Sequence, residues 1–198
     1  MADGQFDEPV QVSSHDAFGE IASALNGMQA SLKARIQAEH EVAAVNLRVR
    51  NALDKATTSI MLADNDGQIV YCNDAVLAML QDAEADIRRD LPNFRVVGLI
   101  GRNFDEFHQT PNHQRNLLGR LQGEHKATVR IGGRTFALVA NPVVNKQGVR
   151  LGSVVEWQDR TNEVRVEQEL AGLLQAAVAG DFARRLSIEG KVGFFATV

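Results

Sequence analysis

Apolar residues in the first part of the chain recur at alternating spacings of four and three. The run comprises Ile21, Leu25, Met28 and Leu32. This spacing predicts an amphipathic helix with the narrow seam of a coiled coil, and Asp16 is placed to cap its first turn. A helix that packs on its own domain needs a wider apolar face. The seam therefore favours pairing with a second chain over packing within one chain.

This seam weakens in its middle. Arg35 and Glu39 fall on it before apolar residues resume at Val42, Val49 and Leu53. Charged residues at seam positions reduce the apolar contact that a coiled coil can make there. We therefore expect the helix to continue for many turns, with a weaker central stretch.

From about residue 57 the period changes from helical to alternating. Two short apolar runs joined by the turn Asn65-Asp66-Gly67 predict a β-hairpin. Three further strands follow later, and Gly132-Gly133 forms a two-residue turn between the first two of them. The predicted strands cover residues 59–63, 68–72, 124–131, 135–144 and 151–158.

Short helices are expected between the hairpin and the closing strands. Asn73 or Asp74 caps the first, Pro111 opens the last, and residues 101–109 are irregular. After the last strand a helix resumes at Thr161, its expected N-cap. The order predicts an α+β fold with one five-stranded antiparallel sheet. The expected intervening helices cover residues 73–80, 83–90 and 111–118.

Composition narrows the functional classes. With 198 residues and a net charge of −4, the chain fits one domain plus helical segments, and nothing suggests nucleic acid binding. The single cysteine, Cys72, excludes an internal disulfide and a thiol zinc site and fits a reducing, cytoplasmic setting. No apolar run approaches a membrane span, and Met1 leads into a polar stretch. No catalytic triad, phosphate loop or carboxylate pair appears, so we expect no enzyme.

A short phrase occurs near each end of the chain. Residues 4–12 are echoed by residues 180–188, each with a glycine, a phenylalanine and an alternating apolar stretch. A repeat that flanks an unrelated middle is typical of a module inserted between two copies of a coupling unit. The middle is therefore expected to sense a signal, and the ends to carry it.

The middle resembles the PAS family of sensor domains. The stretch from Ala63 to Ala75 looks like the opening strands and first helix cap of that family, and Asp159-Arg160-Thr161 looks like its closing signal motif. The flanks resemble HAMP units. The implied organisation is the second part of a HAMP unit with a connecting helix (1–50), a PAS domain (51–161), and a helix entering a second HAMP unit (162–198). Such an arrangement is similar to bacterial chemotaxis receptors, in particular the soluble haem-containing aerotaxis transducers among the methyl-accepting chemotaxis proteins.

That resemblance implies haem b as cofactor and oxygen or another diatomic gas as ligand. The segment Ile100 to Gln114 looks like the one that carries the iron-ligating histidine, which corresponds to His108. Trp157, the only tryptophan, lies where this subfamily uses an indole to hold oxygen. An indole N–H only donates, so it would favour oxygen over the less polarised carbon monoxide. Leu138 and His125 could line the same pocket.

The resemblance also implies a route for the signal. Asp159 and Thr161 would relay the ligand state to the following helix. The chain would act as a homodimer through its HAMP and coiled-coil helices, and a chemotaxis adaptor and kinase would be reached through regions outside it.

Other interpretations stay open. The domain could hold a flavin, another small ligand or none, or could serve only for dimerisation. His113 is a competing ligand one helical turn beyond His108. Flavin-bonding PAS domains use a helix cysteine, whereas Cys72 lies at a predicted strand end, which favours a buried thiol.

Overall fold

The computed structural model describes residues 17–108 and 110–179. The chain divides into two units, residues 1–53 and residues 54–198. The repeated phrases at 4–12 and 180–188 and the predicted cap at Asp16 lie outside the described residues.

A single long helix, α1 (Ala17–Asp54), makes up the described part of the first unit. The prediction of one continuous helix is confirmed, including the stretch where charge interrupts the seam. The seam side chains Ile21, Leu25, Met28 and Leu32 are all exposed in the single chain. Among the described helices, none is long and apolar enough to cross a membrane.

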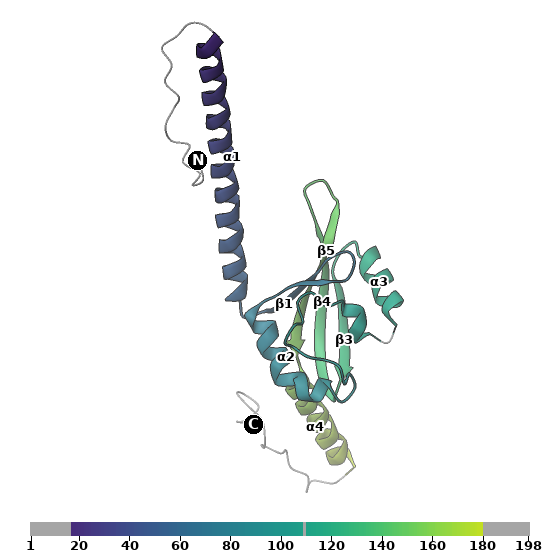
Figure 1. Cartoon of the computed structure of the whole chain (residues 1–198). Helices are drawn as coiled ribbons and strands as arrows, with labels where there is room; N and C mark the ends of the chain where they lie inside the picture. Colours follow the sequence, from purple (N-terminus) through teal and green to yellow (C-terminus); the bar gives the residue numbers. More distant parts are fainter. Residues whose placement is uncertain (1–16, 109, 180–198) are drawn as a thin grey trace. The chain divides into compact units, whose positions relative to one another are not determined.

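The second unit is built on the predicted antiparallel sheet, with the strand order β2-β1-β5-β4-β3 (Figure 1). The first strand of the unit therefore pairs with the last one. The five predicted strands are confirmed, and each observed end lies within one residue of its prediction. Their bounds are β1 (Ser59–Ala63), β2 (Ile69–Cys72), β3 (His125–Ile131), β4 (Arg134–Val144) and β5 (Arg150–Asp159).

The turn between β3 and β4 requires glycine for two reasons. Gly132 and Gly133 have φ angles of 59° and 82°, in the left-handed region that other residues rarely adopt. A Cβ atom added at Gly132 would lie 1.9 Å from the carbonyl oxygen of Asp86. The hairpin can therefore approach the helix that carries Asp86 closely only because this position has no side chain.

The helices differ from the prediction in one respect. We expected separate helices at 73–80 and 83–90, but one helix, α2 (Asp74–Ile87), covers both. Val76, Leu80, Ala83 and Ile87 keep one buried face along the whole length of α2, and this continuous face explains the continuous helix. The others are η1 (Phe104–Phe107), α3 (Pro111–Arg120) and, after the sheet, α4 (Thr161–Val178).

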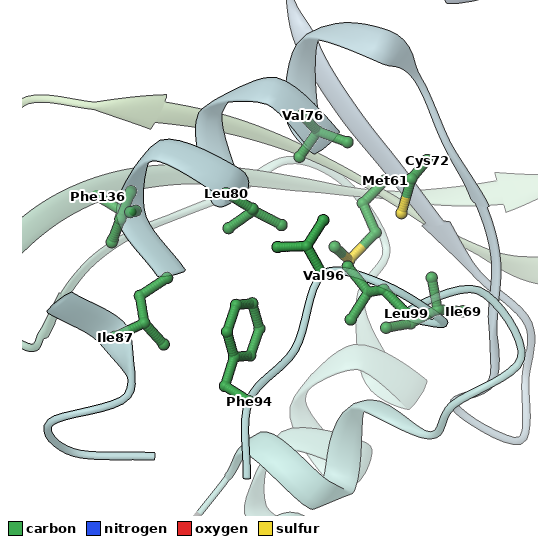
Figure 2. Close-up of a cluster of buried hydrophobic side chains, with 11 residues drawn as sticks. Met61, Ile69, Cys72, Val76, Leu80, Ile87, Phe94, Val96, Leu99 and Phe136 are labelled. Atoms are coloured by element: carbon green, nitrogen blue, oxygen red, sulfur yellow. The ribbon is translucent and has the colours of Figure 1, made fainter. Parts of the chain in front are cut away.

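The core lies between α2 and one face of the sheet. Met61, Ile69 and Cys72 contribute from β1 and β2, and Phe136 from β4. The segment between α2 and η1 closes the cluster with Phe94, Val96 and Leu99, as Figure 2 shows.

Asn73 joins three parts of this unit and is fully buried. Its side-chain oxygen accepts hydrogen bonds from the backbone N–H of Ile60 (2.9 Å) and of Val76 (3.1 Å). Its amide nitrogen donates to the carbonyl oxygen of Thr58 (2.8 Å). The prediction that Asn73 caps this helix is confirmed. The same side chain also fixes the start of β1 against the start of α2.

Replacing Asn73 with alanine tests this role. Asn73→Ala leaves three backbone groups without this partner, one of them fully buried, so we expect the free energy of unfolding to fall by about 2–4 kcal/mol. Chemical denaturation measures the change. Asn93→Ala, at an exposed position, is the matched control and should change stability by less than about 0.5 kcal/mol. Equal stabilities of the two variants would contradict the role of Asn73.

Candidate functional site

Three of the predicted site residues lie on the same face of the sheet. Trp157 on β5 pairs directly with Leu138 on β4 and with Ser59 on β1. Leu138 in turn pairs with Ala127, and His125 lies two residues before Ala127 on β3. Directly paired residues share a face, and so do residues two apart on a strand. Trp157, Leu138 and His125 therefore share a face, and Phe136 of the core lies on it as well.

Trp157 carries a buried indole N–H that has no hydrogen-bond partner in the part of the chain that the structure describes. Its indole packs against the core and meets the Phe136 ring edge-on, with ring centroids 5.9 Å apart. The indole Nε1 is buried, and no hydrogen-bond partner for it exists within residues 17–108 and 110–179. Buried N–H groups nearly always have a partner, so an orphaned one marks a place where a ligand acceptor could bind.

His108 follows the last residue of η1 and is exposed. Its Nδ1 lies 2.8 Å from the carbonyl oxygen of Phe104, which can only accept. Nδ1 must therefore carry the proton of the neutral ring, and Nε2 keeps its lone pair. Histidines that ligate metals in proteins are commonly oriented by a second-nitrogen hydrogen bond of this kind.

The segment that carries His108 is attached to the core. Phe107 packs against the core cluster and meets the ring of Phe94 edge-on at 5.4 Å between centroids. The guanidinium group of Arg102 lies over the Phe107 ring, with its Cζ 4.9 Å from the ring centroid. Asp105 is held by Arg115 of α3, whose Nε lies 2.6 Å from its carboxylate. These contacts fix η1, and with it the backbone on which His108 stands.

The remaining histidine and cysteine candidates have clear positions. His113 lies in the first turn of α3 and is exposed. Cys72 ends β2 and is buried, and burial raises the pKa of its thiol to about 11. This confirms the prediction of a buried thiol. A thiol with that pKa stays protonated at neutral pH.

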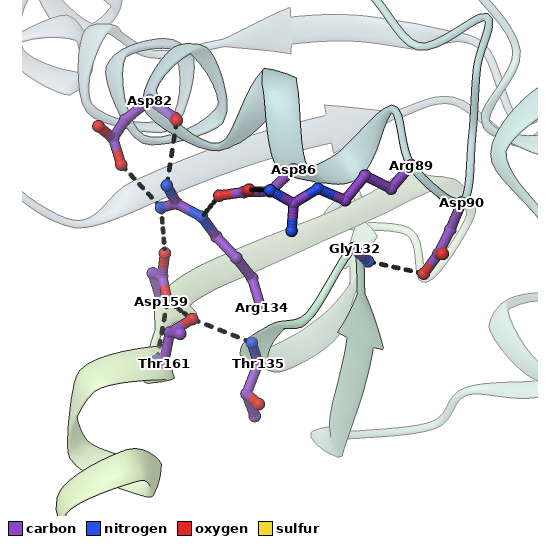
Figure 3. A network of polar contacts seen from close by, with 9 residues as sticks. All are labelled: Asp82, Asp86, Arg89, Asp90, Gly132, Arg134, Thr135, Asp159 and Thr161. Atoms are coloured by element: carbon purple, nitrogen blue, oxygen red, sulfur yellow. Dashed lines mark hydrogen bonds and ion pairs between the residues drawn. The ribbon is translucent and has the colours of Figure 1, made fainter.

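At the other end of the sheet, Arg134 is the centre of an ionic network (Figure 3). Its Nε donates to Asp86 at 2.7 Å, and its Nη1 donates to Asp82 at 2.7 Å and to Asp159 at 3.0 Å. Asp82 and Asp86 belong to α2, whereas Asp159 is the last residue of β5. One guanidinium therefore links the helix that covers the core to the strand that leads into α4.

Charge in this network shifts the pKa values of its members. The hydrogen bond from Arg134 lowers the pKa of Asp86 below its ordinary value of 3.8, against the opposing effect of burial. Burial lowers the pKa of Arg134, but the hydrogen bonds to its three carboxylate partners outweigh it, and the net shift is upward. Both shifts keep the pairs ionised at neutral pH.

The junction to α4 is organised by Asp159 and Thr161. The carboxylate of Asp159 accepts from the backbone N–H of Thr161 at 2.9 Å and also from its hydroxyl group. The Thr161 hydroxyl oxygen accepts from the backbone N–H of Thr135 at 3.0 Å. The prediction that Thr161 is the N-cap is wrong. Thr161 is the first helical residue, Arg160 stands at the cap position, and the hydroxyl binds β4 instead of the helix.

Sequence reasoning missed Arg134, although a signal was present. Arg134 is in phase with Phe136 and Leu138 on β4, so it sits at a position that faces the core layer. Asp159 is in phase with Trp157 in the same way. A positive and a negative residue at inward positions of neighbouring strands indicate an ion pair at the end of a sheet.

Family models match two parts of the chain, and one relative matches most of it. The family model for PAS domains matches residues 47–111, and the family model for HAMP domains matches residues 1–34. The methyl-accepting chemotaxis protein McpB of Pseudomonas aeruginosa is 48% identical over 179 residues. That match covers 89% of this chain and 26% of the relative, so the chain spans about a quarter of the length of the relative.

Two of the solved structures that resemble this chain are described as containing PAS domains. One is described as the Aer2 receptor from Vibrio cholerae, a dual PAS-heme oxygen sensor; it is 30% identical, with a TM-score of 0.48, and the match covers 52% of this chain and 93% of that one. The other is the PAS domain of BvgS from Bordetella pertussis, which is 19% identical, with a TM-score of 0.42 and coverage of 65% and 95%.

The family matches and the sheet topology lead to the same conclusion. The five-stranded antiparallel sheet with helices on it is the arrangement expected of a PAS domain. The chain therefore comprises a PAS domain preceded by a HAMP segment, and it is similar to part of a methyl-accepting chemotaxis protein.

Proposed function

We propose that the PAS domain of this chain binds haem b and reports the binding of oxygen, or of another diatomic gas, to the helix that follows it. The observation that carries the proposal is the buried indole N–H of Trp157, which has no partner among the described residues. A donor held ready in an apolar core suits a small ligand with a partly negative acceptor atom.

His108 would hold the cofactor. Its Nδ1–H is committed to the Phe104 carbonyl, so Nε2 is the nitrogen available to a metal. Haem would supply a ferrous iron at which a diatomic gas can bind. Because Phe107 anchors η1 to the core and Arg115 binds Asp105 of η1, the loss of freedom on binding at His108 would be smaller than for a free loop.

Trp157 would discriminate between gases. Its N–H donates to an acceptor and cannot accept, so it stabilises the ligand whose outer atom carries more negative charge. Leu138 on β4 pairs with it, and Ala127 on β3 pairs with Leu138. These apolar side chains would limit the access of water, which would strengthen any hydrogen bond made there. His125 lies on the same face of β3, at the edge of the apolar lining.

The output would pass through the ionic network. Trp157 and Asp159 lie two residues apart on the same face of β5, so a shift of the indole moves the strand end that binds both Arg134 and Thr161. Coupling requires two arrangements of this junction that the ligand binds unequally. The signal would then reach the second HAMP unit that the sequence predicts after α4, and a chemotaxis adaptor and kinase through regions outside this chain.

The first test is an absorption spectrum of the protein expressed with added haem. Wild type should show a Soret band that shifts on reduction and again on oxygenation, and the band should vanish in His108→Ala because the iron loses its ligand. His113→Ala is the matched control and should keep the band. A band that survives in His108→Ala would reject His108 as the ligand, and a colourless or yellow wild type would reject haem.

Trp157 is tested by gas affinity. Trp157→Phe keeps an aromatic ring but has no N–H, so oxygen affinity should fall by about tenfold to a hundredfold, the loss of one hydrogen bond to a charged acceptor. Carbon monoxide affinity should change much less. Trp157→Leu should behave in the same way and still fold. Unchanged oxygen affinity in both variants would sink the assigned role.

The role of Arg134 is tested by measuring haem binding and the response of α4 separately. Arg134→Met keeps the aliphatic stem but removes the link between α2 and Asp159, so the Soret band should persist while gas no longer changes hydrogen exchange at the start of α4. Arg89→Met is the control, because Arg89 pairs only with Asp86 in the network (3.0 Å) and is largely exposed. A normal α4 response in Arg134→Met would contradict the relay.

The same variant has a pH signature. The folded pKa of Asp86 is below its ordinary value of 3.8, so the stability it contributes is present above that pH and is lost as pH falls through the folded pKa. The stability difference between wild type and Arg134→Met, measured by urea denaturation, should be constant near neutral pH and shrink below pH 3.8. A stability difference between the two proteins that grows as the pH falls would contradict the ion pair between Arg134 and Asp86.

A further inference from the structure

Asp105 carries a second buried polar atom that has no hydrogen-bond partner in residues 17–108 and 110–179. This atom is the carboxylate oxygen Oδ1, an acceptor, whereas the other such atom is the donor Nε1 of Trp157. A buried carboxylate oxygen without a partner costs free energy, because it has lost its hydration and accepts no hydrogen bond in its place. A group of this kind in a native structure calls for a functional reason, and the roles proposed above do not use it.

The other oxygen of the same carboxylate is firmly bound. Nε of Arg115 on α3 donates to Oδ2 at 2.6 Å, and Nη2 of Arg115 lies 2.5 Å from the same oxygen. The Asp105 side chain is 22% exposed, and that of Arg115 is 46% exposed. The ion pair is therefore neutral as a whole but uneven, since its positive end reaches the solvent while the free oxygen Oδ1 of its negative end is buried.

Asp105 lies one turn before His108, the residue proposed to hold iron. The backbone N–H of His108 donates to the carbonyl oxygen of Asp105 at 3.1 Å, and the side-chain oxygen of Asn103 accepts from the backbone N–H of Asp105 at 3.0 Å. Asp105 is therefore held at a fixed place in η1. The neighbouring Glu106 has different surroundings, because its side chain is 46% exposed and pairs with Arg102.

We infer, on the basis of the proposed haem function, that Asp105 lowers the reduction potential of an iron held by His108 and that Arg115 partly offsets this effect. Reduction of ferric to ferrous iron takes up one electron and removes one positive charge from the site. A buried negative charge nearby stabilises the more positive ferric form, because charges interact strongly where water is excluded. The charges and hydrogen bonds around a ligating histidine are features by which a protein sets such a potential.

Redox titration of the haem-loaded full chain, with mediator dyes as the source of electrons, tests the role of Asp105. Asp105→Asn removes the charge and keeps the shape, so the equilibrium constant for reduction should rise by at least about tenfold, or about 59 mV for one electron. Glu106→Gln is the matched control. It makes the same change of charge in the same turn at a solvated position, and should change the constant less than about twofold. Equal shifts in the two variants would contradict a special role of the buried carboxylate.

Arg115→Met separates the effect of charge from that of packing. Both Asp105→Asn and Arg115→Met weaken the link between η1 and α3, so a purely structural effect would shift the potential in the same direction in both variants. The electrostatic role predicts opposite directions, because the charges removed have opposite signs. Arg115→Met should lower the equilibrium constant for reduction, and the double variant should lie between the two single variants. Shifts of the same sign in both single variants would overturn the inference.

Hydrogen exchange in the haem-free chain gives a readout that does not depend on the cofactor. No residue of α3 is buried, so its attachment depends on polar contacts such as the bond from Arg115 to Asp105. Exchange in α3 should be faster in Asp105→Asn and in Arg115→Met and unchanged in Glu106→Gln. Unchanged exchange in all three variants would contradict the ion pair on which the inference is built.

The spectra distinguish failure of this inference from failure of the proposed function. A wild type without a Soret band would reject haem binding and, with it, the tuning by Asp105. A Soret band that depends on His108, together with equal potentials in wild type, Asp105→Asn and Arg115→Met, would leave the haem site standing and overturn only the role of Asp105.

Discussion

The pairing of β1 with β5 is the interaction on which the fold of the second unit, residues 54–198, depends. It joins the first strand of the unit to the last, with Ser59 opposite Trp157 and Ala63 opposite Ser153. Without it the opening hairpin and the three closing strands would be two separate small sheets, and α2 would have no continuous face to cover. The same pairing sets the position of Trp157, because strand register fixes which side chains face the core.

β5 carries both residues of the proposed signal path, Trp157 and Asp159, on one face. Trp157 lies in the apolar interior, and Asp159 lies two residues further on, where the strand leaves the sheet. Arg134 extends the connection to α2, and Thr161 extends it to α4 and to the backbone of β4. Under the proposed function, a change at the indole would be transmitted over a short, covalently continuous path to a junction held by ionic hydrogen bonds. Short paths through rigid elements are the physical condition for coupling between sites.

Local patterns predicted the elements, and non-local contacts explain the misses. The strands follow from alternation, the Gly132-Gly133 turn from its backbone requirement, and the Asn73 cap from its short polar side chain. The split of α2 into two helices was wrong because a polar stretch near Asp82 hides a continuous buried face. The wrong cap at Thr161 has a similar cause, since the hydroxyl binds Thr135, a partner 26 residues away.

In the candidate site, too, some features follow from local sequence patterns and others depend on non-local contacts. The positions of Trp157, Leu138 and His125 on one face follow from strand parity and register once the sheet order is known. The missing partner of the Trp157 indole cannot be read from sequence, because it is a property of everything packed around that atom. For Arg134, one feature is predictable from the sequence and the other is not. Its inward phase was visible, but its three carboxylate partners come from α2 and from the end of β5.

The most direct test of this account uses the single tryptophan as its probe. With one Trp in the chain, a nitrogen–proton NMR correlation spectrum contains one indole signal, which needs no assignment. The haem-loaded ferrous protein would be compared under oxygen and under carbon monoxide, where the ring environment is nearly the same. The indole signal should move, and its proton should exchange more slowly with solvent under oxygen, because only oxygen accepts a strong hydrogen bond from the indole N–H. An indole signal with the same position and exchange rate under both gases would contradict this account.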